Sequence, residues 1–187
     1  MKWGLLLFVI VAAACERTPV MPTRVPTAPP EYNRADWPQW IDEDGDCQDT
    51  RQEVLIQESL VAPTLDAARC RVVAGRWQDE YTGVVYVDPA LLEIDHRVPL
   101  VNAHHSGGWV WDRSRKRDYA NDLRDPAHLV AVGAATNRSK GDKGPEAWRP
   151  PLRERWCDYA TGWRDIKQRW DLVVSTDEER ALREMCS

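Results

Sequence analysis

Apolar residues recur at three- to four-residue steps in several parts of the chain, and this spacing predicts amphipathic helices. The clearest runs from 152 to 170 and places on one side Trp156, Tyr159, Trp163, Ile166 and Trp170. We expect these aromatic residues to form core rather than a binding platform. Shorter helices are predicted at about 50–60, 99–108, 133–141 and 177–185.

Short β-prone runs lie between these helices. The runs 70–77 and 83–87 predict a hairpin around the turn at Asp79–Gly83, and two further strands are predicted at 93–98 and 128–132. The stretch 109–127 is polar and rich in turn residues, which favours a loop. The expected fold class is therefore α+β.

The N-terminus has the pattern of an export signal. Residues 1–14 contain Lys2 and then an apolar run too short to span a bilayer, which takes about 20 residues. The "AAAC" ending resembles a lipoprotein cleavage site, so Cys15 is expected to be acylated and to anchor the protein in a membrane; plain secretion is the alternative. A proline-rich linker is expected at 15–36 and the folded domain at 37–187. The protein is thus expected in the cell envelope or outside the cell.

Four cysteines remain after Cys15, and an even number in an exported chain indicates two disulfides. Three pairings are open to Cys47, Cys70, Cys157 and Cys186. We expect nearest neighbours to pair, Cys47 with Cys70 and Cys157 with Cys186, because this leaves the centre of the chain unconstrained. No Cys-x-x-Cys spacing occurs, so a thiolate zinc site fits poorly.

The net charge of −5 conceals an asymmetry along the chain. Residues 31–95 carry a balance of −10, whereas residues 96–170 carry +6. An acidic protein is a poor candidate for binding nucleic acid, but a basic half restores that class of function. The basic run "RSRKR" at 113–117 either follows a nucleic-acid backbone or forms a solvated surface.

The basic half begins beside a pair of reactive side chains, "DH" at 95–96. Asp95 offers a hard oxygen for a divalent cation, and the imidazole of His96 can take a proton from water near neutral pH. Asn137 offers a further oxygen, and three cations follow it: Arg138, Lys140 and Lys143. Phosphodiester hydrolysis needs a cation, a base and positive side chains. Neighbouring residues on a regular strand point to opposite faces, so the pair is expected at a bend or end of its strand.

The motifs "DHRVPL", "AHHSGG", "YANDL" and "HLVAVGAATNRSKGDKGPEAWRPP" together resemble those of the HNH nuclease superfamily, more narrowly the secreted bacterial HNH endonuclease-like proteins. The resemblance extends from about Cys47 to Cys186. It implies a ββα-metal core with flanking helices and a β-hairpin.

Carried onto this chain, the resemblance implies that Asp95 and Asn137 bind the metal and that His96 is the general base. His128 occupies the place of the asparagine that usually orients this base, which is a departure from the family pattern. His128 is a catalytic candidate, and three roles are open to it: orienting His96, contacting phosphate, or packing. Arg138, Lys140 and Lys143 are implied as substrate contacts. Glu93, two residues before Asp95, is expected to be a surface or supporting carboxylate.

We expect an exported, monomeric enzyme: a metal-dependent endonuclease that acts on DNA, or on RNA, with little sequence specificity. The cofactor is expected to be Mg²⁺, with Mn²⁺ or Ca²⁺ as alternatives. Two other readings are a non-catalytic envelope lipoprotein that binds a partner through this scaffold, and a phosphodiesterase with another substrate.

Overall fold

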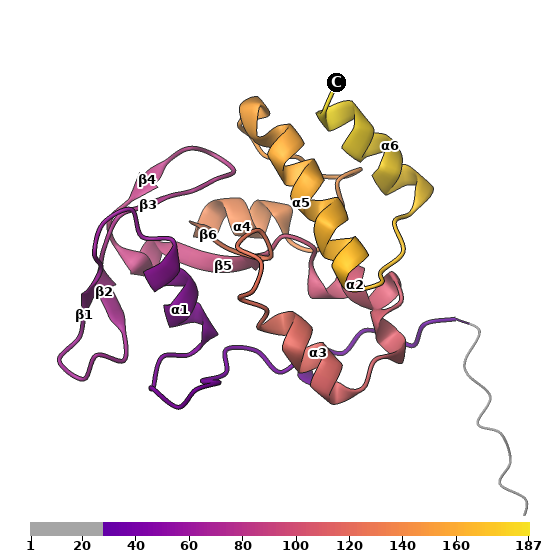
Figure 1. Ribbon diagram of the computed structural model, residues 1–187. Coiled ribbons are helices and arrows are strands. Elements are labelled where there is room, and N and C mark those ends of the chain that lie inside the picture. Colours follow the sequence, from indigo (N-terminus) through magenta and orange to yellow (C-terminus); the bar gives the residue numbers. More distant parts are fainter. Residues whose placement is uncertain (1–27) are drawn as a thin grey trace, which may run out of the picture.

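The computed structural model describes residues 28–187, which form an α+β fold, as expected. The α-helices of this part are α1 (Thr50–Gln57), α2 (Leu100–His105), α3 (Arg113–Ala120), α4 (Ala134–Lys140), α5 (Trp156–Arg169) and α6 (Thr176–Met185). Its strands are β1 (Thr64–Leu65), β2 (Val72–Ala74), β3 (Trp77–Gln78), β4 (Val85–Tyr86), β5 (Leu92–His96) and β6 (Leu129–Gly133). Figure 1 shows α5 beside α6 at one end of the molecule and β1–β4 at the opposite side, with β5, β6 and α4 between them.

The central sheet joins two segments that are far apart in the sequence. Strands β5 and β6 are antiparallel, with a register that runs from Leu92 opposite Gly133 to His96 opposite Leu129. Helix α4 starts at the residue after β6, so it packs back onto β5. The intervening residues, 97–128, contain α2 and α3. The strands predicted at 93–98 and 128–132 are thus confirmed within two residues.

This sheet has an apolar cluster on each face. On one face Val130 and Val132 pack in a cluster that includes Trp163 and Ile166 of α5. The opposite face carries Leu92, Ile94, Leu129 and Ala131, which pack with Val54 and Leu55 of α1. The expectation that the aromatic side of 152–170 is core is confirmed for Tyr159, Trp163 and Trp170, which are buried.

Two carboxylates cover the outer edge of β6, where the sheet has no further strand. The Ala131 amide donates to Glu58 Oε2 at 2.9 Å, and the Gly133 amide donates to Asp79 Oδ2 at 3.0 Å. Asp79 Oδ1 also accepts from the amides of Tyr81 and Thr82 in the hairpin turn. Because unpaired backbone amides are costly to bury, these two side chains replace a missing strand.

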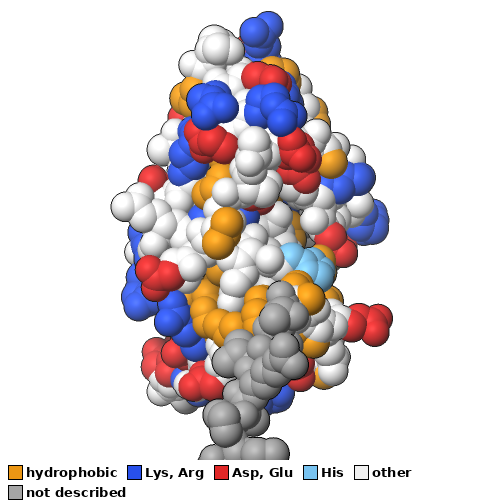
Figure 2. Space-filling view, turned by 90° about the vertical axis from the view of Figure 1, so that its right-hand side faces the viewer, with side chains coloured by type: hydrophobic (Ala, Val, Ile, Leu, Met, Phe, Trp, Pro, Cys, Tyr) orange, Lys and Arg blue, Asp and Glu red, His pale blue; other side chains and the backbone are white. Residues whose placement is uncertain are grey.

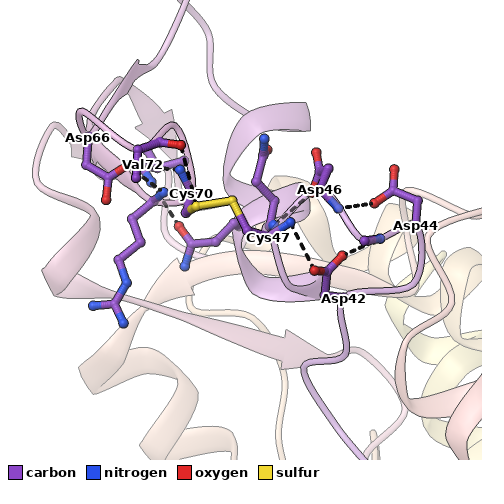
Figure 3. The surroundings of a disulfide bond; sticks show 12 residues. Asp42, Asp44, Asp46, Cys47, Asp66, Cys70 and Val72 are labelled. Carbon is purple, nitrogen blue, oxygen red and sulfur yellow. Dashed lines mark hydrogen bonds between the residues drawn. A yellow bond between two sulfur atoms is a disulfide. The ribbon is translucent and has the colours of Figure 1, made fainter.

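The cysteines pair as expected, Cys47 with Cys70 and Cys157 with Cys186. Figure 3 shows the first bond beside an acidic loop, in which Asp42 and Asp46 accept hydrogen bonds from backbone amides of residues 45, 47 and 48. The second disulfide joins the start of α5 to the end of α6. Each bond therefore closes a local segment and leaves the β5–β6 region unconstrained.

Three expectations about local structure need correction. The stretch 109–127 contains helix α3, capped by Asp112, which the pattern missed because only Lys116, Tyr119 and Ala120 are buried on it. The run 70–77 is divided: β2 pairs with β1, and only β3 pairs with β4 across the expected turn. Contacts with the domain also begin before Trp37, since His104 Nε2 lies 2.8 Å from the Pro30 carbonyl.

The predicted signal peptide (1–14), the predicted acylation site Cys15 and the first part of the predicted linker (15–36) lie outside the described residues. Within 28–187, no helix is both long enough and apolar enough to cross a membrane.

Candidate functional site

Strand β5 presents its polar residues on two different faces. Side chains alternate along a strand, so Glu93 and Asp95 face α4, whereas His96 leaves the strand on the side of Leu92 and Ile94. Asp95 and His96 are the last two residues of β5, as the sequence predicted for the pair. They nevertheless do not converge on one point in this structure.

Asp95 is buried and engaged through both carboxylate oxygens. Oδ1 accepts from Lys140 Nζ at 2.8 Å, and Oδ2 accepts from the Tyr81 hydroxyl at 2.8 Å. Burial raises the pKa of Asp95, and the attraction of Lys140 opposes this shift. A cation could reach Asp95 only after displacing the ammonium group of Lys140.

Lys140 is a structural partner rather than a surface cation. Its side chain is fully buried, and Nζ also donates to the backbone carbonyl of His96 at 2.9 Å. The expected role of Lys140 as a substrate contact is therefore corrected, because a polymer cannot reach it here. The ammonium group instead holds the end of α4 to the last two residues of β5.

Asn137 lies one helical turn before Lys140 and contacts Glu93. Asn137 Nδ2 donates to Glu93 Oε2 at 2.8 Å, and Arg138 Nη1 donates to Glu93 Oε1 at 3.0 Å. Among the described residues, no donor contacts the Asn137 side-chain carbonyl oxygen. Glu93 and Asn137 thus both place oxygen atoms at a partly exposed position, and Glu93 is a surface carboxylate paired with Arg138.

His96 is 7% exposed and is held on two sides. Its ring stacks on Trp40 with centroids 5.7 Å apart, and Nε2 lies 2.9 Å from the Ala120 carbonyl oxygen. Since a carbonyl only accepts, Nε2 carries the hydrogen and Nδ1 keeps its lone pair. Burial, and then the neighbouring His128, lower the pKa of His96 to about 3, so the ring is neutral at physiological pH.

His128 makes no hydrogen bond to His96, so packing is the role, of those open to it, that this structure shows. The two rings are perpendicular with centroids 6.1 Å apart, and neither nitrogen of His128 has a hydrogen-bond partner among the described residues. The ring packs edge-on to Tyr119 at 4.6 Å. Burial lowers the pKa of His128 to about 4, so this ring is also neutral at physiological pH.

The remaining cations expected at the site are exposed. Arg138 pairs with Glu93, and Lys143 Nζ donates to the Ser139 carbonyl. Sequence reasoning missed the carboxylates of Asp42, Asp44 and Asp46, whose oxygens lie within 4.8 Å of one another. Several of these oxygens accept amides of their own loop, and the alternation of acidic residues in "DEDGD" is the signal that would have drawn attention to them.

Comparison with known proteins gives one informative relative. No family model matches the chain, and no solved structure matches it. An "Uncharacterized secreted protein" of Arthroderma benhamiae is 39% identical over 154 residues, which cover 82% of this chain and 74% of the fungal protein. The two disulfides and this secreted relative agree that the protein is exported. The chain belongs to the same family as this secreted fungal protein.

Proposed function

We propose that the protein is an exported endonuclease that hydrolyses nucleic-acid phosphodiester bonds, with DNA as its main substrate and an HNH-like site at the end of β5. One observation carries the proposal: Lys140 Nζ bonds both the Asp95 carboxylate and the His96 carbonyl. The motifs "DH" and "NRSK", whose first residues are 42 positions apart, are thereby held together as strand and helix, and this contact supports the ββα arrangement that we propose.

In this proposal His96 accepts a proton from the attacking water. Its neutral ring has a lone pair on Nδ1, and the Ala120 carbonyl fixes the ring through Nε2. General-base catalysis by a positioned side chain contributes about 10²–10⁴-fold to a rate. The low pKa ensures that the ring is unprotonated but also makes it a weak base, so partial exposure of the ring on substrate binding would increase its effectiveness.

The side chains of Glu93 and Asn137 offer oxygen ligands of the kind that suits a divalent cation, most simply Mg²⁺. Asp95 would join them where Lys140 moves aside. A bound cation would supply positive charge to the phosphate oxygens. These oxygen ligands and the His96 ring lie on opposite faces of β5. A phosphodiester can therefore contact the cation and the ring together only past the end of the sheet, beyond the residue pair His96 and Leu129.

A second candidate is an envelope lipoprotein without catalytic activity, anchored through an acylated Cys15, that binds a partner through this scaffold. It is favoured by the engagement of Asp95 and His96 with protein groups, since both oxygens of Asp95 and one nitrogen of His96 are occupied.

Incubation of the full mature chain with supercoiled plasmid and with single-stranded DNA and RNA separates the two candidates. The nuclease proposal predicts cleavage with Mg²⁺ or Mn²⁺ that EDTA abolishes. Binding without cleavage, under every metal including Ca²⁺, would contradict it and support the binding protein. Replacement of Cys15 by Ser, followed by membrane fractionation, tests the anchor: the anchored form predicts release from membranes.

A further inference from the structure

A large cleft lies beside the segments that hold the His96 ring. It has a volume of about 860 Å³ and is lined on one side by residues between 41 and 53, and on the other by residues between 115 and 124 with Arg169 and Trp170 at the end of α5. One wall carries four arginines, Arg115, Arg117, Arg124 and Arg169, together with Asp118 and Asp122. We call this space the arginine cleft.

The arginine cleft adjoins the surroundings of His96. Asn121, in its lining, follows Ala120, whose carbonyl contacts the His96 ring, and Ile41 follows Trp40, which stacks on that ring. Arg138 and Lys143, in contrast, belong to α4 and the turn after it, on the opposite face of β5. Cations of the cleft are therefore better placed to hold a substrate at His96 than those of α4.

The arginines of this wall combine exposure with spare donors. The side chains of Arg115, Arg117 and Arg169 are 41–44% exposed, and that of Arg124 is 72% exposed. Each pairs with at least one carboxylate, including Asp118 and Asp122 within the cleft, and Arg117 Nη2 also lies 3.9 Å from Oε1 of Glu43 on the facing side. Because a guanidinium group has five N–H donors, each can contact a phosphate without giving up its carboxylate.

The opposite wall is acidic. Glu43, Asp44 and Glu53 line it, together with the neutral Gln48 and Thr50. Burial raises the pKa of Glu53, and repulsion from Asp46, Asp44 and Asp42 adds to this shift, which reflects a negative potential along the wall. A polyanion would therefore place its phosphates against the arginines and turn another part of itself toward the carboxylates.

We propose that the arginine cleft binds single-stranded nucleic acid, with phosphates along the wall of arginines and base amino groups toward the carboxylates of the facing wall. This inference rests on the proposed nuclease function and specifies its substrate. A single strand has an anionic edge and a base edge with amino donors, which matches the two walls. A duplex carries phosphates on both edges and would press one backbone against the acidic wall. The volume also lies within the about 300–1,000 Å³ of small-ligand pockets, which suits a few nucleotides.

Fluorescence anisotropy in EDTA, where cleavage is suppressed, tests the cleft directly. The probes are labelled 12-nucleotide single strands of DNA and RNA and the corresponding DNA duplex. Wild-type protein is expected to bind a single strand more tightly than the duplex. The double variant Arg117→Gln/Arg124→Gln is expected to bind the single strand roughly tenfold more weakly at low salt. The slope of log K against log[salt] should fall in magnitude by about 1.4, or 0.7 for each lost phosphate contact.

A matched control is available on α6. Arg180 and Arg183 are exposed and paired with carboxylates like the cleft arginines, and Figure 2 shows acidic and basic side chains intermingled at the upper end of the molecule, where α6 lies. Arg180→Gln/Arg183→Gln should bind the single strand as wild type does. The inference would be overturned if the duplex bound as tightly as the single strand or more tightly, or if the cleft variant bound as wild type does. It would also be overturned if the loss appeared in Arg138→Gln/Lys143→Gln instead, or if no binding were seen. Cleavage of plasmid, single-stranded DNA and RNA, measured separately, decides whether the nuclease proposal falls with it.

Discussion

At the scale of residues, the candidate site depends most on the ion pair of Asp95 and Lys140. Lys140→Met leaves the buried Asp95 carboxylate without its cation, so we expect a loss of about 3–5 kcal/mol in the free energy of unfolding. Urea denaturation measures it. The double variant Asp95→Asn/Lys140→Met removes both charges and should recover much of that loss; equal stability of Lys140→Met and wild type would show that the pair is not formed.

The two buried histidines make stability dependent on pH. Their pKa values fall from the usual 6.5 to about 3 for His96 and about 4 for His128. The unfolded chain therefore binds more protons below pH 6.5, and stability is lost as the pH falls toward these values, by about 2 kcal/mol per histidine between pH 7.5 and 5. Glu58 acts in the opposite direction, because burial raises its pKa to about 7.

A comparison of variants separates these contributions. His128→Leu removes one of the histidines and keeps Glu58, so its stability should fall less than that of wild type between pH 7.5 and 5, by about 2 kcal/mol. Urea unfolding at both pH values provides the measurement. An identical pH dependence for wild type and variant would mean that His128 titrates normally in the folded protein.

At the scale of elements, the covered edge of β6 gives a further prediction. Asp79→Ala removes the acceptor of three backbone amides, at Tyr81, Thr82 and Gly133, and should cost about 3 kcal/mol or more. Chemical denaturation tests this. Asp88→Ala is the matched control, because Asp88 is exposed and accepts only the Ala90 amide. Similar losses in the two variants would contradict the role assigned to Asp79.

The elements show how far sequence patterns reach. β5, β6 and α4 were predictable because β-prone runs, Pro99 and glycines mark their ends. Helix α3 was not predictable, because its buried face consists only of the aliphatic part of Lys116 and of Tyr119 and Ala120 at its end. The contact of Lys140 with Asp95 was equally hidden: an "NRSK" run at a helix end reads as solvated charge, and only tertiary packing turns its last residue inward.

At the scale of the whole molecule, the two disulfides hold the periphery together. They close loops with separations of 23 and 29 residues, each expected to contribute about 3–4 kcal/mol. The free energy of unfolding of Cys157→Ser/Cys186→Ser, measured in urea, should therefore be lower than that of wild type by this amount. A reducing agent should lower the free energy of unfolding more in wild type, which has two disulfides, than in this variant, which has one. A variant as stable as wild type would show that packing of α5 on α6 suffices.

The central claim is that His96 acts as the base in phosphodiester hydrolysis, and the rate of DNA cleavage with Mg²⁺ tests it most directly. The comparison is between wild type, His96→Ala and His105→Ala, an exposed histidine of α2 as control. We predict that His96→Ala lowers the rate by about 10²–10⁴-fold while its circular dichroism matches wild type, and that His105→Ala cleaves normally. Undiminished cleavage by a folded His96→Ala protein would contradict the account.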